Sequence, residues 1–191
     1  PFGVWLNEAT IYEQVGDYQS LNCLLLIWDR KHHKIALFRG STLPHITAVN
    51  EQRQQPDARV ANQLSMGLYN YRVGAHEPEG RPPEEGAFRL SRLQPVPIWR
   101  YGEKGLWLDL SVPNDHIHSA QSRTQPTGIS YASAGCQVVE GDQTDAGIEG
   151  LYQTFRLFAG LSAQPHRDEI GLPYQYLLTH TRHLEAIALG S

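Results

Sequence analysis

Residues 24–40 read LLLIWDRKHHKIALFRG, and this stretch decides the fold that the sequence predicts. Two apolar runs, residues 24–28 and 35–38, flank a polar segment that contains His32 and His33. Apolar runs on either side of a short polar stretch are typical of a β-hairpin. We therefore predict two strands joined by a turn, with both histidines solvated in that turn.

The rest of the chain contains further segments with the pattern of strands. They are found at residues 68–73, 87–90, 107–110 and 172–178. Residues 98–101 are expected to form an edge strand at most, because Pro95, Pro97 and Gly102 interrupt this part of the chain. Apolar residues at helical spacing predict one helix in residues 151–161. Since strands outnumber helices, we predict a mostly β fold, an antiparallel sandwich or barrel with one or two helices.

Several segments lack a clear period. Residues 76–86 are rich in Pro and Gly, and residues 140–150 are acidic and contain Gly, so both are expected to be loops. Residues 41–63 fit either a short helix or a long surface loop. Residues 183–189 fit a strand or a terminal helical turn, and residues 1–20 an irregular lead-in.

Length and composition exclude some classes of protein. A chain of 191 residues is long enough to form one domain with a substantial core. Its net charge of −4 and its three lysines argue against a nucleic-acid partner. No apolar run approaches the roughly 18 residues that span a bilayer. The chain begins with Pro1 and shows no export leader, so we expect a processed form or an excised domain, with room for further domains outside it.

A His and a Cys stand out in residues 116–139, which read HIHSAQSRTQPTGISYASAGCQVV. Cys136 follows Gly135 in a short polar turn, and His118 precedes it by 136 − 118 = 18 positions. An imidazole that takes the thiol proton makes the sulfur a strong nucleophile. The glycine allows a tight turn that aims backbone N–H groups at an oxyanion. These residues predict nucleophilic catalysis by Cys136 with His118 as its base, and the alternative is a buried Cys beside unrelated histidines.

Other polar residues near this stretch are weaker candidates. His116 rivals His118 as the base, because residues two apart on a strand face the same side. Asp109 and Asp115 are expected to be solvated. No Cys23–Cys136 disulfide is expected, since Cys23 begins an apolar strand whereas Cys136 lies in a polar loop.

The order of these features resembles the L,D-transpeptidases of the YkuD type, cysteine enzymes that act on peptidoglycan stem peptides. The hairpin of residues 24–40 fits the opening strands of that family. Residues 83–90, PEEGAFRL, fit its P-x-G-x-F loop with one extra residue between Pro and Gly. His118-Ser119 followed by residues 133–137, SAGCQ, fits its signature of a His-Gly or His-Ser pair and then Ser/Thr-His-Gly-Cys.

The resemblance implies one domain over residues 1–191, with a core at residues 21–140 and an extension at residues 141–191. It implies that Cys136 forms a thioester with a stem peptide, and that the backbone carbonyl of Ser119 orients His118. It also implies an oxyanion site at the backbone of Ala134 and Gly135, and substrate contacts from Ser133, Gln137, His116, Tyr71 and Arg89. No cofactor or metal is expected, and the implied location is the periplasm or the cell wall.

Two residues depart from the family pattern: Ala134 stands where the family has His, and Gln137 where it has Arg or Asn. The fate of the thioester therefore stays open. Attack by an amine would make a cross-link, and attack by water would make the chain an L,D-carboxypeptidase or endopeptidase. Two further alternatives are a zinc site formed by His116, His118 and Cys136, and a wall-binding module without activity.

Overall fold

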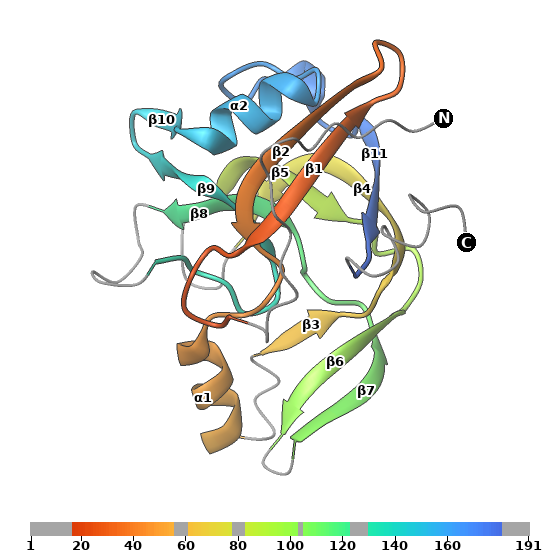
Figure 1. The fold of residues 1–191 in the computed structure, drawn as a ribbon, viewed down its shortest axis with the longest axis vertical. Coiled ribbons are helices and arrows are strands. Elements are labelled where there is room, and N and C mark those ends of the chain that lie inside the picture. The colour runs from red at the N-terminus through yellow and green to blue at the C-terminus, as the bar shows by residue number, and fades with distance from the viewer. Residues whose placement is uncertain (1–16, 56–60, 78–82, 103–104, 123–129, 181–191) are drawn as a thin grey trace.

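The computed structural model describes residues 17–55, 61–77, 83–102, 105–122 and 130–180 (Figure 1). About half of these residues lie in strands, and two α-helices are found among them, so the predicted mostly β fold is confirmed. No described helix combines the length and the apolar character needed to cross a lipid bilayer. The expectations for residues 1–16 and 183–189 lie outside the described residues.

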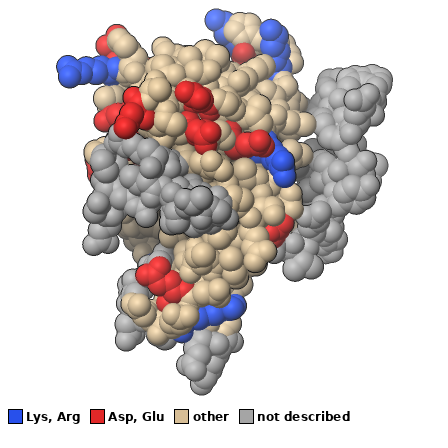
Figure 2. All heavy atoms as spheres, turned by 90° about the vertical axis from the view of Figure 1, so that its left-hand side faces the viewer, with Lys and Arg blue, Asp and Glu red and all other residues tan. Residues whose placement is uncertain are grey.

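Figure 2 shows acidic side chains gathered in the upper part of one face.

One large sheet curls into a half-barrel. Its strands lie in the spatial order β1-β2-β9-β8-β5-β4-β11, and β10 pairs with β9. They are β1 (Cys23–Asp29), β2 (Lys34–Ser41), β4 (Gly67–His76), β5 (Glu84–Leu90), β8 (Ile117–Ser122), β9 (Gln137–Thr144), β10 (Gly147–Glu149) and β11 (Pro173–Leu178). The predicted antiparallel pairing holds for every pair in this sheet except β8 and β9, which are parallel.

The hairpin predicted from residues 24–40 forms the β1–β2 pair. Leu25 lies opposite Phe38, and both side chains are buried. Alternation along the strand turns Leu24 and Leu26 to the other face, where about half of each side chain is exposed. His32 is exposed in the turn, as predicted, and its Nδ1 lies 2.6 Å from Oδ2 of Asp29.

A second, three-stranded sheet has the order β3-β6-β7, formed by β3 (Asn62–Leu64), β6 (Val96–Gly102) and β7 (Gly105–Ser111). The prediction of an edge strand at residues 98–101 was wrong, because β6 is the central strand. Pro97 is tolerated there since it lies near the start of β6 and is paired with Leu110 of β7 but with no residue of β3. The open choice for residues 41–63 is decided by α1 (Ile46–Gln54).

Both predicted loops contain strand residues. Residues 140–150 include the end of β9 and all of β10, and residues 76–86 include the end of β4 and the start of β5. Strand pairing overrides local composition at these positions. Gly141 and Gly147 have φ values of 141° and 124°, which other residues rarely adopt, so the glycines that suggested a loop serve the β9–β10 hairpin.

The helix predicted within residues 151–161 is α2 (Leu151–Phe158), which crosses the upper part of the large sheet (Figure 1). Phe155 packs edge-to-face against Phe38 and Phe88, with ring centroids 5.1 and 5.5 Å apart. Tyr152 is fully buried beside it. Since β11 also pairs with β4, residues 141–180 complete the sheet and its core.

Candidate active site

The parallel β8–β9 pair brings the predicted His and Cys together. In its register His118 lies opposite Val138, and Ile117 lies opposite Gln137. Parallel neighbours run in the same direction, so the residue just before β9 lies beside the first residues of β8. Cys136 is that residue, and its Sγ lies within 4.8 Å of a ring nitrogen of His118.

The turn before Cys136 is held by the hydroxyl group of Ser133. Oγ of Ser133 donates to the carbonyl oxygen of Cys136 at 2.7 Å and accepts from the N–H of Gly135 at 3.1 Å. The carbonyl of Ala134 accepts from the N–H of Asn62 at 2.9 Å, which joins the turn to β3. The Ser133 hydroxyl is therefore engaged within the turn, and the substrate contact implied for Ser133 stays a prediction.

Gly135 is required because there is no room for a larger side chain at this position. Its φ is not positive, so the turn does not need the conformational freedom that the sequence suggested. A Cβ at this position would lie 2.5 Å from Oδ1 of Asp115 and 2.7 Å from Nδ2 of Asn62. The missing side chain lets a buried carboxyl and a buried amide approach the backbone next to the thiol.

Cys136 is 7% exposed, and its sulfur has two backbone neighbours. Sγ donates to the carbonyl of Asn114 at 3.2 Å and accepts from the N–H of His116 at 3.4 Å. Burial, and then the charge of Asp115, raise the pKa of the Cys136 thiol well above its usual value. The resting sulfur is therefore a thiol. Cys23 and Cys136 are both free, as predicted.

His118 is held in one tautomer. Its Nδ1 lies 2.7 Å from the carbonyl oxygen of Ser119, which is the contact that the resemblance implied. A carbonyl oxygen only accepts, so Nδ1 carries the hydrogen and Nε2 keeps the lone pair. Burial lowers the pKa of the His118 ring to about 4, partly opposed by this hydrogen bond. At neutral pH the ring is therefore uncharged and able to accept a proton.

His116 has a different position from His118. Its Nδ1 accepts a hydrogen bond from the N–H of Leu90 at 3.3 Å, so that nitrogen is engaged with β5. Its main-chain N–H is the group that contacts Sγ. Burial is the main cause that lowers the pKa of the His116 ring to about 3. The geometry therefore favours His118 as the base and gives His116 a role through its backbone.

Tyr71 and Gln137 lie beneath the site. Both side chains are almost fully buried. The Tyr71 hydroxyl lies 2.8 Å from the carbonyl oxygen of Asp115 and 2.9 Å from Oε1 of Gln137. Nε2 of Gln137 donates to the carbonyl of Gly135 at 3.1 Å. Their polar atoms therefore support the turn from inside, and the substrate contacts implied for these two residues stay predictions.

The prediction that the two acids near the site, Asp109 and Asp115, are solvated was wrong. Asp115 is buried and accepts from Nδ2 of Asn62 at 2.5 Å. Burial raises the pKa of the Asp115 carboxyl to about 8, opposed by the Asn62 hydrogen bond, so the group is largely protonated at neutral pH. Asp109 is half-buried and pairs with Nε of Arg100 at 2.7 Å.

Arg89 stays a candidate for a substrate contact. The register of β5 and β8 pairs Phe88 with Ile117, which places Arg89 beside His116. Its guanidinium is partly exposed and lies 3.8 Å from Oε1 of Glu77. It is therefore a cation near the site that solvent reaches.

Sequence reasoning missed two residues beside His118. The ring of His76, at the end of β4, stacks on the His118 ring with centroids 4.3 Å apart and planes 7° apart. Oε2 of Glu84, a buried residue at the start of β5, lies 3.9 Å from Nδ1 of His118. Residues 76–86 were predicted to form a loop because they are rich in Pro and Gly, so His76 and Glu84 were not considered as site residues. The alternation of residues 68–73, extended through Gly74 to His76, was the signal available.

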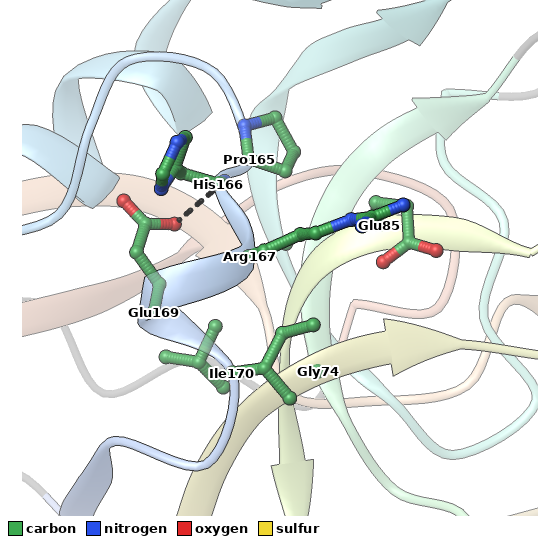
Figure 3. Close-up of a pocket in the computed structure, with 9 residues that line it drawn as sticks. Gly74, Glu85, Pro165, His166, Arg167, Glu169 and Ile170 are labelled. Carbon is green, nitrogen blue, oxygen red and sulfur yellow. Dashed lines mark hydrogen bonds between the residues drawn. The ribbon is translucent and has the colours of Figure 1, made fainter.

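A hollow of about 290 Å³ lies between β4, β5 and the segment after α2 (Figure 3). Its wall includes Gly74, Glu85, Pro165, His166 and Arg167. Neither His118 nor Cys136 lines it, so it is separate from the thiol. In Figure 3 the Arg167 side chain extends toward Glu85.

No family model, curated protein or solved structure gives a significant match to this chain.

Proposed function

We propose that the chain is a cysteine enzyme that transfers an acyl group from a peptide. The observation that carries this proposal is the geometry of His118. Its Nδ1 is fixed on the Ser119 carbonyl, and a ring nitrogen lies within 4.8 Å of the Cys136 sulfur. A nucleophile, a base and a group that orients the base are the three parts that such catalysis needs.

In the proposed reaction, Sγ of Cys136 attacks the carbonyl carbon of a peptide bond. The thiol pKa is raised and the imidazole pKa is lowered, so the two groups do not form a resting ion pair. The proton therefore moves from Sγ to Nε2 of His118 as the C–S bond forms. The imidazolium then protonates the leaving amine as the C–N bond breaks, which leaves a thioester on Cys136.

The negative charge on the carbonyl oxygen would be stabilised by backbone N–H groups of the turn. The N–H of Gly135 is engaged with Oγ of Ser133. Within the described residues, the N–H groups of Ala134 and Cys136 make no hydrogen bond. We therefore assign the oxyanion site to Ala134 and Cys136, in place of the predicted Ala134 and Gly135.

The proposed substrate is the stem peptide of peptidoglycan, and this part rests on the resemblance of residues 21–140 to the L,D-transpeptidases. An amine of a second stem peptide is the proposed acceptor, which makes the reaction an L,D-transpeptidation. Water as the acceptor would make it a carboxypeptidase or endopeptidase reaction. The proposed location is the periplasm or the cell wall, where this substrate is found.

The test uses the full chain and peptidoglycan fragments with tetrapeptide stems, analysed by mass spectrometry. We expect an acyl adduct on Cys136 and cross-linked dimers as products. Cys136→Ala should abolish both, and Cys23→Ala, which removes the other thiol, should keep both. Shortened stems without dimers would show hydrolysis instead. Equal turnover by Cys136→Ala and the unchanged protein would refute the assignment of Cys136 as the nucleophile.

A further inference from the structure

We propose that His76, His118 and Cys136 form a binding site for one zinc ion, and that bound zinc blocks the nucleophile. This inference rests on the proposed function for its consequence, although the metal site itself does not depend on it. The three side chains come from the end of β4, from β8 and from the turn before β9. They offer two imidazole nitrogens and one sulfur within 4.8 Å of one another.

The type of donor favours zinc. Zinc binds imidazole at about 2.0–2.1 Å and thiolate at about 2.3 Å in a tetrahedral arrangement, which places neighbouring donors about 3.3–3.6 Å apart. The three donors therefore need to approach one another by about 1 Å or slightly more. Magnesium and calcium prefer oxygen ligands and do not suit this set.

Two of the three ligands already have the outer contacts that support a metal ion. A histidine that binds a metal commonly donates its other ring N–H to a carbonyl or carboxylate. Nδ1 of His118 has that contact with the Ser119 carbonyl at 2.7 Å. A thiolate needs a nearby donor to stabilise its charge, and the N–H of His116 lies 3.4 Å from Sγ. His118 and Cys136 are thus prepared for zinc before it binds.

His76 is the ligand that has to move. Its ring lies nearly parallel to the ring of His118, so the lone pairs of the two rings do not converge on one point. His118 is buried and held by Ser119, whereas His76 is half-buried at the end of its strand. Rotation of the His76 ring out of the stack therefore completes the site.

Zinc binding would release one proton, because the Cys136 thiol becomes a thiolate bound to the metal and the proton passes to solvent. The bound sulfur no longer attacks a carbonyl, and His118 no longer accepts a proton. Zinc therefore acts as an inhibitor that occupies both catalytic groups. It is released when a stronger chelator lowers the free zinc concentration.

The test uses the full chain, stripped of metal and titrated with Co²⁺ and then Zn²⁺. We expect one Co²⁺ per chain, a thiolate-to-cobalt absorption band in the near ultraviolet, and loss of that band when Zn²⁺ replaces Co²⁺. His76→Ala should weaken zinc binding by more than about 100-fold, since loss of even an outer contact costs about 10- to 100-fold. His32→Ala, which removes an exposed histidine of the β1–β2 turn, is the matched control and should bind as the unchanged chain does.

A second readout is alkylation of Cys136 in a Cys23→Ala background, which zinc should slow. No bound cobalt, a band that persists in Cys136→Ser, or equal zinc affinity in His76→Ala would overturn the zinc site. The acyl adduct measured on zinc-free protein tests the proposed function separately. If zinc-loaded protein turned over substrate and zinc-free protein did not, the zinc site would stand, but its inhibitory role and the cysteine mechanism would fail.

Discussion

At the scale of single residues, the surroundings of His118 determine both its tautomer and its pKa. Its ring is buried, its Nδ1 is bonded to Ser119, and its pKa is lowered to about 4 by burial. A base with this pKa is already uncharged in mildly acidic solution. We therefore expect His118 to accept a proton down to about pH 5 without first losing one.

The pKa of His118 predicts how stability depends on pH. In the unfolded chain the ring has its ordinary pKa of 6.5, but in the folded chain its pKa is about 4. The unfolded state thus binds more protons between these values, so stability from this group is full above about pH 6.5 and falls as pH decreases toward 4. Unfolding in denaturant at about pH 7.5 and about pH 4.5 measures this.

The control for this pH dependence is His118→Gln, which cannot titrate. We expect the unchanged protein to lose about 2 kcal/mol more than the variant over that range, since one pKa unit corresponds to about 1.4 kcal/mol. Parallel losses in the two proteins would show that the folded ring has an ordinary pKa.

Asp115 predicts the opposite trend. Its pKa rises from 3.8 to about 8 on folding because of burial, so the folded state holds a proton that the unfolded state has lost. Stability from this group falls as pH increases from about 4 to about 8. Asp115→Asn keeps a polar group beside Asn62 and has no proton to lose. Relative to the unchanged protein, the variant should therefore gain about 3 kcal/mol between pH 5 and pH 8, measured by denaturant unfolding. No gain would mean that the buried carboxyl is ionised.

At the scale of elements, the turn of residues 133–136 and the parallel β8–β9 pair define the site. The turn is held by the Ser133 hydroxyl, and the pair aligns the beginnings of its two strands. The bond from the N–H of Gln137 to the carbonyl of His116, 2.8 Å long, ties the turn to β8. The approach of the thiol to His118 therefore depends on the turn as much as on the residues themselves.

Gly135→Ala tests the turn. The added Cβ would lie 2.5 Å from Oδ1 of Asp115, so the turn or the carboxyl has to shift. We expect a loss of about 1–3 kcal/mol in unfolding free energy, as is typical of overpacking, and slower formation of the acyl adduct. Gly67→Ala is the matched control, because its Cβ would meet neighbours no closer than 3.4 Å. Equal losses in the two variants would contradict the tight contact at Gly135.

At the scale of the whole molecule, residues 141–180 contribute part of the core and one strand of the large sheet. Phe155 of α2 fills the core between Phe38 and Phe88, and β11 covers the edge of β4. The buried Arg156 guanidinium donates to the carbonyl of Gly86 and pairs with Glu169 at 2.6 Å. The predicted core of residues 21–140 therefore lacks part of its own interior.

We predict that residues 21–140 alone do not fold cooperatively. Circular dichroism during heating should show no sharp transition for this fragment, whereas the full chain should show one. Phe155→Ala in the full chain isolates the core contact and should cost about 3–5 kcal/mol in denaturant unfolding. A fragment that unfolded as sharply as the full chain would show that residues 141–191 are an appendage.

The sequence alone determined the elements whose pattern is local. Two apolar runs flank a polar stretch in residues 24–40, and apolar residues recur at helical spacing in residues 151–161, so the hairpin and α2 could be predicted. The pairing of Cys136 with His118 was predicted from residue types and a resemblance. The contact between His118 and the Ser119 carbonyl was implied by the resemblance alone.

Only the tertiary structure decided which other residues join them. Strand register, which no local pattern encodes, brings His76 to Cys136, Glu84 to His118, and Asn62 to Asp115. The burial of Asp115 and Gln137 was decided in the same way, because local sequence does not show whether a polar side chain is solvated until its neighbours in the fold are placed. The proposed zinc site depends on that register, since His76 reaches the thiol through the order of β4, β5 and β8 in one curled sheet.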